Sequence, residues 1–599
     1  MTVPNRATLW GRTLVEELVA SGLEAVCVAP GSRSTPLTVA FAQHPDVAVY
    51  SHLDERSASF FALGRARRTG EVTALVCTSG TAAANFHPAV IEADRARVPL
   101  LVLTADRPPE LRDSGANQTV DQQKLYGDAV RWYAELPVPE PEGRALRMLR
   151  TTAARALANT IGTPAGPVHL NCPFRKPLEP TPLSGSVPDG LEETLAGSGR
   201  DGPFVRTTAG ETALPAESRE AQRIARVLED ANRPLVVAGP ADPPVRRLDP
   251  GVLVDLATAI GAPIFADPLS GVRFGSHLED LEEGLVCGGY DSYVDAVPDP
   301  DVVLRIGDSP TSKSLSHALR DADCRQILID PAGEWREATF TATDLVGAEP
   351  QGVLEAVAAA VEYDRARGTT DDGWLERIRE AETIHWQGRD DARTGDSLEA
   401  EPFEGAILAS VFEDAPETAT VFVSNSMPVR DADRFGRPRS ADLTVLANRG
   451  ASGIDGITST ALGAGSATDE PLVLVTGDLA FYHDSNGLLA LERCGVDATI
   501  VLLDNDGGGI FHLLPIESFD PPFTGQFKTP HGLAFDPLGE LYGFDMIHVD
   551  PTAFADAYAA SLESPGTQVV SVSFDAETSH RRREQLEEQV REACLTDER

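Results

Sequence analysis

Short apolar runs rich in β-branched residues alternate with helical stretches along most of the chain. In the first third, five such runs predict strands at 25–28, 47–50, 72–77, 100–103 and 168–170. Runs of this kind are typical of strands buried in a parallel sheet. Because they alternate with helices, they predict a sheet that is covered on both faces. The first third of the chain is therefore expected to form a doubly wound α/β domain.

The same rhythm returns twice further along the chain. The predicted strands are 235–238, 263–265, 302–306 and 327–329 in the middle, and 421–424, 444–446, 472–476, 499–503 and 569–572 in the last third. A Pro/Gly/Ser-rich stretch at 180–210 and a polar stretch at 363–402 are expected to be linkers. The pattern thus predicts three doubly wound parallel-sheet α/β domains at 1–180, 211–362 and 400–599, each of ordinary domain size.

Composition adds a strong bias in charge. The formal net charge is −41 over 599 residues, which weighs against nucleic acid or an anionic membrane as a partner. The acidic residues are spread along the chain, and lysine occurs only at Lys124, Lys176, Lys313 and Lys528. A dispersed carboxylate surface with scarce lysine suggests a protein adapted to concentrated salt, where charge repulsion is screened within about 3 Å at 1 M. An acidic protein of an ordinary mesophile is the alternative.

The location is expected to be cytoplasmic. Seven cysteines are scattered without a Cys-x-x-Cys pair, which indicates neither a disulfide framework nor a zinc site. The amino-terminal residues lack the apolar core of a signal peptide, and no apolar run approaches the roughly 20 residues of a membrane span.

Acid and amide side chains follow two predicted strands of the last domain. Gly477-Asp478-Leu479 comes after strand 472–476, and Asp504-Asn505-Asp506 comes after strand 499–503. The carboxyl ends of parallel strands share one edge of a sheet, where α/β proteins bind ligands. Mg²⁺ prefers oxygen ligands and often links carboxylates to phosphate oxygens, so Asp478, Asn505 and a backbone carbonyl at Gly507 are the expected ligands. Ordinary strand-ending turns would explain the same residues.

Four polar loops at predicted strand ends in the first domain are the second candidate site. They span 30–36, 54–56, 78–82 and 106–118 and would line one cleft. Glu55 begins a predicted helix in the second of these loops. By itself such a glutamate is most simply a first-turn acid favoured by the helix dipole, worth about 0.3–1 kcal/mol.

These motifs resemble two nested groups of enzymes. Gly-Asp followed some two dozen residues later by Asn is similar to the metal-binding signature of thiamin-diphosphate enzymes. Leu479 and Asp506 depart from that signature, which usually has Gly and Asn there. The longer segments 31–37, 104–111, 115–118 and 448–456 resemble the 2-succinyl-5-enolpyruvyl-6-hydroxy-3-cyclohexene-1-carboxylate synthases of menaquinone biosynthesis. The resemblance covers essentially the whole chain.

The resemblance implies a fold of the thiamin-diphosphate enzyme type and a transferase reaction. In that family 2-oxoglutarate is decarboxylated, and the succinyl carbanion equivalent adds 1,4 to isochorismate. The implied cofactors are thiamin diphosphate and Mg²⁺ or Mn²⁺, with Asp478, Asn505 and Gly507 as metal ligands. The cofactor would lie between two subunits of a homodimer or homotetramer.

The family also implies a role for each candidate residue. Glu55 would be catalytic, through a hydrogen bond to the cofactor's aminopyrimidine. Substrate binding would fall to Ser32, Arg33, Arg107, Asn117, Gln118, Lys313, Ser426, Arg430 and Arg449, since both substrates are dianions and arginine binds carboxylates bidentately. The remaining cofactor-binding residues would be Ile454, Gly477, Gly508, Ile510, Phe511 and Leu514.

Each of these residues also has a purely structural interpretation. Any one arginine would otherwise be a surface ion pair, Lys313 a solvated loop residue, and the apolar residues part of a core. Two other functions also fit parts of the pattern. A different thiamin-dependent 2-oxoacid decarboxylase or carboligase would keep Glu55, Asp478 and Asn505 but need fewer cations. The other is a cofactor-binding or assembly protein that has lost activity.

Overall fold

The computed structural model describes residues 3–208, 214–215, 217–241, 248–281, 284–371 and 373–597. The chain divides into two compact units. The first unit comprises Met1–Gly210, Asn448–Asp469 and His483–Val496, and the second comprises Glu211–Ala447, Glu470–Tyr482 and Asp497–Arg599. The predicted boundary at 210–211 lies outside the described residues, and the three-domain division remains a prediction.

Three parallel sheets form the framework, as the sequence predicts. Within the described residues each sheet has six strands, in the orders β2-β1-β3-β4-β6-β5, β12-β11-β10-β7-β8-β9 and β14-β13-β15-β16-β18-β17. The pairings between neighbouring strands are parallel, for example Val28 opposite Ser51 and Val76 at the ends of β1, β2 and β3. Parallel strands need crossover connections, which the intervening helices supply.

The strands have these bounds: β1 Ala25–Val28, β2 Ala48–Ser51, β3 Thr73–Cys77, β4 Leu100–Asp106, β5 Trp132–Glu135, β6 Val168–Pro173, β7 Pro234–Ala238, β8 Ile264–Ala266, β9 Val286–Cys287, β10 Val302–Ile306, β11 Arg325–Ile329, β12 Asp344–Val346, β13 Thr420–Val423, β14 Thr444–Leu446, β15 Leu472–Gly477, β16 Thr499–Asp504, β17 Asp545–Val549 and β18 Gln568–Ser573. Four of them, β5, β9, β12 and β17, were not predicted. All four lie at sheet edges. The sequence pattern does not reveal them because they lack a continuous buried run: β9 has two residues, and the others are partly exposed.

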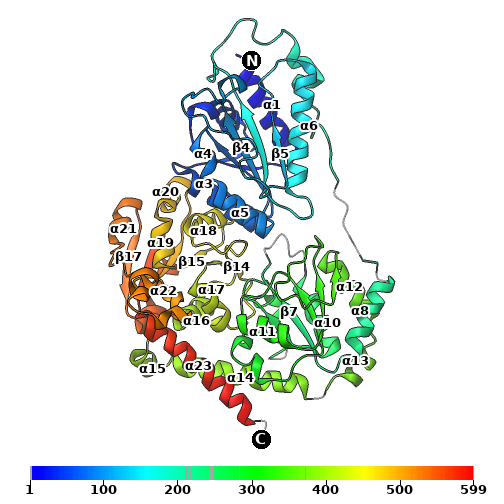
Figure 1. The fold of residues 1–599 in the computed structure, drawn as a ribbon, viewed down its shortest axis with the longest axis vertical. Helices are drawn as coiled ribbons and strands as arrows, with labels where there is room; N and C mark the ends of the chain where they lie inside the picture. Colours follow the sequence, from blue (N-terminus) through cyan, green and yellow to red (C-terminus); the bar gives the residue numbers. More distant parts are fainter. Residues whose placement is uncertain are drawn as a thin grey trace. The chain divides into compact units, whose positions relative to one another are not determined.

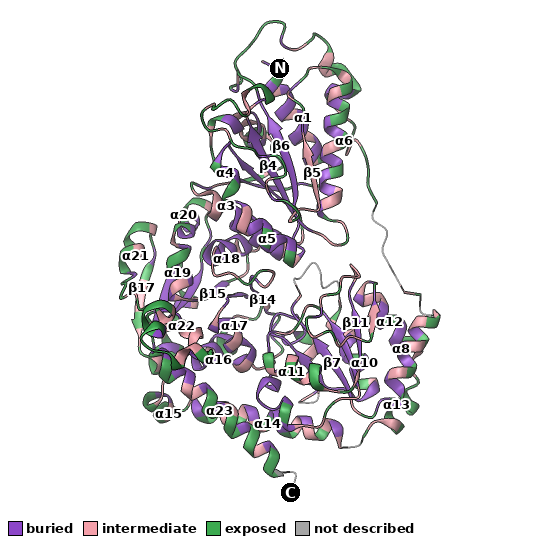
Figure 2. Ribbon diagram, viewed as in Figure 1, coloured by how far each residue is buried: buried purple, intermediate pink, exposed green. Residues whose placement is uncertain are grey.

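The first unit packs helices on its sheet (Figure 1). Its helices are α1 Arg6–Ala20, α2 Thr35–Gln43, α3 Glu55–Thr69, α4 Thr81–Ala84, α5 His87–Ala96, α6 Gly143–Thr160, α7 Leu195–Ser198, α18 Ile457–Gly465 and α20 Ala490–Cys494. Trp10 and Leu14 of α1 and Leu149 of α6 join Leu101 of β4 in one apolar cluster. Figure 2 shows β4 and β6 as buried in this layer.

Helices α3 and α18 approach each other closely because glycines lie between them. A Cβ at Gly64 would come within 1.8 Å of the carbonyl oxygen of Thr460, and one at Gly463 within 2.0 Å of that of Phe61. Any larger residue at either position would force the helices apart. The close packing fixes α3, the helix that begins with Glu55.

The second unit contains the other two sheets. Its helices are α8 Arg219–Glu229, α10 Pro250–Ile260, α11 Lys313–Asp321, α12 Pro350–Ala360, α13 Tyr363–Thr369, α14 Trp374–Ala392, α15 Gly395–Ala400, α16 Glu404–Asp414, α17 Met427–Phe435, α19 Asp478–His483, α21 Asp536–Tyr542, α22 Phe554–Glu563 and α23 Ala576–Asp597. No helix among the described residues combines the length and the apolar content needed to cross a membrane.

Both stretches predicted as linkers contain ordered structure. The stretch 363–402 includes α13, α14 and α15, and Trp374 of α14 is buried in an apolar cluster with Val590 of α23. In the stretch 180–210, α7 packs on the first sheet's helices, where Arg150 donates to the carbonyl oxygens of Ala196 and Gly197 at 3.1 and 2.7 Å. Polar composition concealed these elements because each buries only one face. Residues 209–210 lie outside the described part.

Candidate active site

The carboxylate of Asp478 lies at the centre of a polar cradle in the second unit. β15 and β16 are neighbours, so Asp478 and the loop after Asp504 meet at one sheet edge. Oδ2 of Asp478 accepts hydrogen bonds from the backbone N–H of Gly507 at 2.9 Å and from Nε2 of His531 at 3.1 Å. Asp478 is 2% exposed, and burial raises its pKa to about 6. A cation beside this carboxylate would favour the ionised form.

Asn505 presents an oxygen to the same region. Its Nδ2 donates to Oε1 of Glu404 at 2.7 Å, while its Oδ1 is buried and has no hydrogen-bond partner among the described residues. Buried amide oxygens are rarely left unpaired, so this atom calls for a ligand. Carboxylate, amide and carbonyl oxygens are the donors that Mg²⁺ and Mn²⁺ prefer. The predicted ligands Asp478, Asn505 and Gly507 therefore suit a divalent cation.

The two departures from the metal-binding signature have structural explanations. Leu479 lies in α19, a conformation that a side chain accepts, so glycine is not required there. Asp506 has φ 54°, and its Oδ1 accepts N–H groups of His531 and Gly532 at 2.8 and 2.7 Å. Asp506 thus holds the loop that carries His531 beside Asp478.

His531 and Asp504 extend the acidic cluster. One ligand atom each from Asp478, Asp504 and His531 lies within 4.8 Å of the others. His531 is not among the predicted site residues because nothing in the local pattern of residues 529–533 points to a strand end 53 residues away.

Glycines bring backbone close to this cradle. Gly507 has φ 137°, and a Cβ there would lie 2.1 Å from the carbonyl oxygen of Lys528. The N–H of Gly508 donates to that same oxygen at 2.7 Å. Gly477 ends β15, and a Cβ there would have nothing closer than 4.0 Å. The loop after β16 therefore requires glycine at 507, whereas the free space at Gly477 would admit a ligand.

Apolar candidates continue from the glycines. Ile510 and Phe511 lie in a short 3₁₀ helix over Gly509–Leu513, and both are half-buried. Leu514 follows that helix and is 41% exposed. These side chains follow the cradle in sequence and are not buried in the protein core. Their role as walls of a pocket remains a prediction.

At the carboxyl edge of the first sheet, three loops contact one another. The backbone N–H of Arg33 donates to Oγ1 of Thr78 at 3.2 Å, and its guanidinium donates to the carbonyl oxygen of Phe174 at 2.6 Å. A Cβ at Gly31 would lie 2.4 Å from Thr78, so glycine allows this approach. Arg33 is 4% exposed, and its Nε has no partner among the described residues. Ser32 beside it is exposed.

The loop after β4 joins the same edge. Nε2 of Gln118 donates to the carbonyl oxygen of Ser79 at 2.9 Å, and Oγ of Ser79 donates to that of Gln118 at 3.1 Å. The backbone N–H of Arg107 donates to Oδ1 of Asp106, and the Nε of Arg107 is buried with no partner in the described structure. Asn117 is exposed. The structure thus places at one edge of the first sheet the loops that carry Ser32, Arg33, Arg107, Asn117 and Gln118.

Glu55 is the first residue of α3. Asp54 is the N-cap of this helix, because its side chain accepts hydrogen bonds from the N–H groups of Arg56 and Ser57 at 2.8 and 3.4 Å. The half-buried Glu55 carboxylate does not cap the helix. Burial, followed by the negative charge of Glu55, raises the pKa of the Cys77 thiol well above its usual value. Glu55 therefore lies near the end of β3, at the same edge as Arg33.

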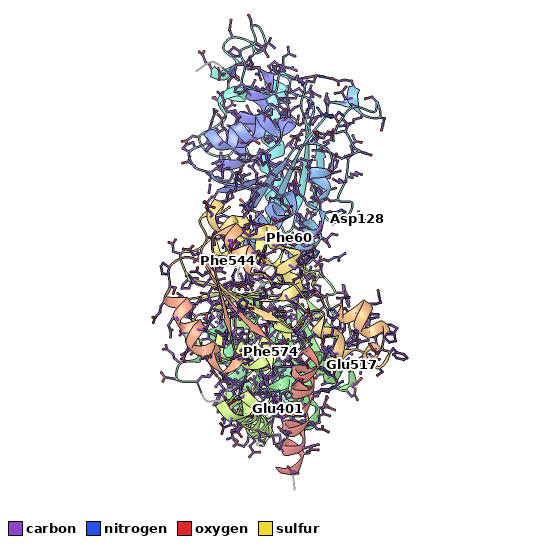
Figure 3. All side chains as sticks on the ribbon, turned by 90° about the vertical axis from the view of Figure 1, so that its left-hand side faces the viewer. Phe60, Asp128, Glu401, Glu517, Phe544 and Phe574 are labelled. Atoms are coloured by element: carbon purple, nitrogen blue, oxygen red, sulfur yellow. The ribbon has the colours of Figure 1, made fainter. Side chains whose placement is uncertain are left out.

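The loop that carries Arg449 and Ile454 belongs to the first unit as well. The carboxylate of Glu92 on α5 accepts the backbone N–H groups of Gly450 and Ala451 at 2.8 and 2.6 Å. Farther along, a Cβ at Gly456 would lie 2.0 Å from the ring of Phe60, which is labelled in Figure 3. Arg449 and Ile454 are half-buried between these anchors.

Three further candidates lie in the second unit. Arg430 on α17 donates from its guanidinium to the carbonyl oxygen of Ser426 at 2.5 Å, and Ser426 has φ 74°. Lys313 is the first residue of α11, and its side chain is exposed. Ser312 caps this helix by accepting a hydrogen bond from the N–H of Leu315. The structure brings Ser426 and Arg430 together, while Lys313 belongs to the middle sheet's helices.

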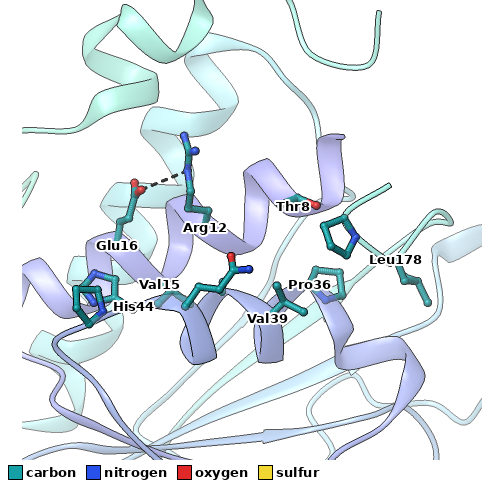
Figure 4. Close-up of a pocket in the computed structure, with 12 residues that line it drawn as sticks. Thr8, Arg12, Val15, Glu16, Pro36, Val39, His44 and Leu178 are labelled. Carbon is teal, nitrogen blue, oxygen red and sulfur yellow. Dashed lines mark ion pairs between the residues drawn. The ribbon is translucent and has the colours of Figure 1, made fainter. Parts of the chain in front are cut away.

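A pocket of about 320 Å³ in the first unit is not part of this site. It lies between α1 and α2. Among the lining residues drawn in Figure 4, one ion pair is present, between Arg12 and Glu16 at 3.3 Å. Apolar groups such as Val15 and Val39 form much of its wall. None of the predicted substrate or cofactor residues lines it.

Sequence comparisons place this geometry in a known class. The thiamine pyrophosphate enzyme N-terminal TPP binding domain matches residues 10–125, and the C-terminal TPP binding domain matches residues 432–596. Two solved structures have the same fold. One is a thiamine diphosphate-dependent 4-hydroxybenzoylformate decarboxylase of Rhodococcus jostii, with a TM-score of 0.68 and 18% sequence identity, covering 94% of this chain and 99% of the other. The second is a benzoylformate decarboxylase of Polynucleobacter necessarius, with a TM-score of 0.69 and 16% sequence identity, covering 95% of this chain and 99% of the other. The predicted fold of the thiamin-diphosphate enzyme type is confirmed.

Full-length relatives define the family. A 2-succinyl-5-enolpyruvyl-6-hydroxy-3-cyclohexene-1-carboxylate synthase of Haloarcula marismortui is 60% identical over the whole of both chains, and one of Halobacterium salinarum is 58% identical over 98% of this chain and 99% of its own. A bacterial synthase of the same name from Roseiflexus castenholzii is 46% identical over 98% of each chain. The chain belongs to the 2-succinyl-5-enolpyruvyl-6-hydroxy-3-cyclohexene-1-carboxylate synthase family. The resemblance found in its motifs is confirmed.

Proposed function

We propose that the chain catalyses the thiamin-diphosphate-dependent decarboxylation of 2-oxoglutarate and 1,4-addition of the resulting succinyl unit to isochorismate. The products would be 2-succinyl-5-enolpyruvyl-6-hydroxy-3-cyclohexene-1-carboxylate and CO₂, a step of menaquinone biosynthesis. The observation that carries the proposal is the 60% identity to a synthase of that name over the whole of both chains.

Residues at the ends of β15 and β16 would hold the cation and the diphosphate. Asp478, Asn505 and the Gly507 carbonyl would bind Mg²⁺ or Mn²⁺, and the open space at Gly477 would let phosphate oxygens approach. Gly508, Ile454, Ile510, Phe511 and Leu514 would surround the rest of the cofactor and exclude water from its reactive carbon. Bound thiamin diphosphate supplies the electron sink for decarboxylation, and the chain supplies position and charge.

Glu55 would hold and exchange a proton at the cofactor's aminopyrimidine. Its carboxylate begins a helix that Asp54 already caps, so it is available to a ligand. The close packing of α3 on α18 would keep that carboxylate in place during turnover. Such fixed geometry is what general acid–base catalysis requires.

Arginines would bind the two dianionic substrates. Arg33 and Arg107 have buried Nε–H groups with no partner among the described residues, and both lie at the edge that holds Ser32, Asn117 and Gln118. Unpaired guanidinium N–H groups in a protein of net charge −41 favour a carboxylate ligand there. We assign that edge, with Lys313, to isochorismate. Ser426, Arg430 and Arg449 are assigned to the carboxylates of 2-oxoglutarate.

The active form is proposed to contain at least two copies of the chain. In thiamin-diphosphate enzymes the cofactor lies between the first domain of one subunit and the last domain of another. Three large apolar side chains of the last third of the chain, Leu514, Phe519 and Leu541, are 41%, 63% and 68% exposed in the single chain. A second copy would cover such groups.

A coupled assay tests the proposal. Purified protein in concentrated salt is given thiamin diphosphate, Mg²⁺, 2-oxoglutarate and isochorismate, and both isochorismate loss and CO₂ release are followed. The two signals are expected to rise together and to stop when either substrate is omitted. CO₂ release with a simple aldehyde as acceptor, without any consumption of isochorismate, would indicate a different carboligase. Absence of cofactor binding would indicate a protein that has lost activity.

A further inference from the structure

The orientation of the Asn505 amide is set by a buried network of charges in the second unit. Nδ2 of Asn505 donates to Oε1 of Glu404 at 2.7 Å, and Glu404 is 2% exposed. The other oxygen of Glu404 accepts from the guanidinium of Arg583, which also binds the carboxylate of Asp431 at 2.7 and 2.6 Å. The backbone N–H of Glu404 donates to Oγ of Ser579 at 3.1 Å. Each oxygen of Glu404 therefore has a fixed partner.

This arrangement leaves one rotational state for the amide. A carboxylate accepts hydrogen bonds and cannot donate them, so only the NH₂ group of Asn505 can face Glu404. The amide oxygen must then point away from Glu404. That oxygen is buried and has no partner among the described residues. A Cβ at Gly509 would lie 2.8 Å from Nδ2, so the backbone also restricts the amide.

We propose that Glu404 is a positioning residue of the cation site, which acts by holding the Asn505 amide with its oxygen toward the metal. The inference rests on the proposed function, since it takes Asn505 as a metal ligand. Arg583 balances the charge of Glu404, and Asp431 in turn holds Arg583. Residues that fix first ligands in this way commonly contribute about 10–100-fold to metal affinity.

The test exchanges donor and acceptor between the two side chains. In Glu404→Gln the new NH₂ group can donate to the amide oxygen of Asn505, which would turn the Asn505 NH₂ group toward the metal. In Asn505→Asp two carboxylates would face each other at hydrogen-bond distance. In the double variant Glu404→Gln/Asn505→Asp, the Gln NH₂ group donates to one carboxylate oxygen and leaves the other for the cation. The double variant therefore restores the polarity of the original pair.

The measurement is Mn²⁺ affinity in the presence of thiamin diphosphate, from the electron paramagnetic resonance signal of free Mn²⁺, which does not depend on turnover. Glu404→Gln is expected to bind Mn²⁺ about 10–100-fold more weakly than the parent chain, and the double variant, in which an oxygen again faces the cation, is expected to recover most of the loss. Glu382→Gln is the matched control, because Glu382 is also a buried glutamate of the second unit but binds the backbone N–H groups of Gly288 and Gly289 instead of Asn505. It is expected to leave Mn²⁺ affinity within about threefold of the parent. Circular dichroism verifies that each variant is folded.

Two results would overturn the inference. One is unchanged Mn²⁺ affinity in folded Glu404→Gln. The other is a double variant that binds Mn²⁺ as weakly as, or more weakly than, Glu404→Gln. Failure of the proposed function is a separate outcome: a parent chain that binds Mn²⁺ and thiamin diphosphate with the expected variant pattern, but does not consume isochorismate, would refute the substrate assignment and leave the role of Glu404 standing.

Discussion

Replacing Glu92 with glutamine should destabilise the first unit and weaken binding of 2-oxoglutarate together. The Glu92 and Arg67 side chains are 4% and 2% exposed and lie 2.9 Å apart. The same carboxylate accepts the N–H groups of Gly450 and Ala451, directly after Arg449. In Glu92→Gln, the side-chain carbonyl can satisfy one of these N–H groups while its NH₂ group opposes another donor.

The magnitude follows from the burial of the pair. Removing one partner of a buried ion pair costs about 3–5 kcal/mol. For a unit of roughly 150–250 residues, 1 kcal/mol shifts the unfolding temperature by about 2–4 °C. Glu92→Gln should therefore lower that temperature by about 6–20 °C. Because the loop that carries Arg449 loses its anchor, KM for 2-oxoglutarate should rise more than KM for isochorismate.

Thermal unfolding by circular dichroism in concentrated salt, with steady-state kinetics below the unfolding temperature, is the assay. Glu192→Gln is the matched control, since Glu192 pairs with Arg12 at 2.6 Å while the two side chains are 31% and 35% exposed, and such pairs contribute about 0–1 kcal/mol. Arg67→Met/Glu92→Gln should recover part of the stability, because both buried charges of the pair are then replaced by uncharged side chains. An unfolding temperature of Glu92→Gln within about 2 °C of the parent, with both KM values unchanged, would refute the reasoning.

Three other predictions concern the cation site, the charge and the pH dependence. Asp478→Ala should weaken Mg²⁺ and thiamin diphosphate binding together, as measured by calorimetry, and an unchanged metal dependence would exclude Asp478 as a ligand. The free energy of unfolding should fall as salt is diluted, because 92 acidic residues face 51 basic ones, and full stability in dilute buffer would contradict a salt-adapted surface. Burial lowers the pKa of His169 to about 3, so the folded state keeps this imidazole neutral while the unfolded chain takes up a proton below pH 6.5. The contribution of His169 to the free energy of unfolding is thus complete above pH 6.5 and decreases on acidification, by about 1.4 kcal/mol at pH 5.5. An NMR signal of the His169 imidazole that titrates near pH 6.5 would show the prediction to be wrong.

The sequence was sufficient for the interior of each sheet and insufficient for the edges. Strands such as β4 and β16 are buried on both faces, so they appear as continuous apolar runs. The edge strand β17 is partly exposed and mixes charged with apolar residues, and that composition does not distinguish it from a loop. The sequence predicts a linker for the stretch that contains α14 for a similar reason, since charged residues dominate the exposed face of that helix.

The candidate site divides in the same way. Asp478 and Asn505 could be paired from the sequence because parallel topology brings neighbouring strand ends together. Glu404 is 101 residues from Asn505, and Glu92 is 358 residues from Gly450. No periodicity or spacing relates positions so far apart. Such supporting contacts depend on the packing of complete elements and become visible only in the structure.

The proposal that the site is shared between two subunits can be tested most directly by mixing two inactive variants. Glu55→Gln removes the proposed proton-transfer group and Asp478→Ala removes the proposed cation ligand, so each homodimer should turn over slowly. Random co-assembly of equal amounts makes half the dimers mixed, and in each mixed dimer one of the two sites combines both intact residues. The account predicts recovery of about a quarter of the parent activity. Mixed dimers that form but remain as inactive as the two homodimers would contradict it.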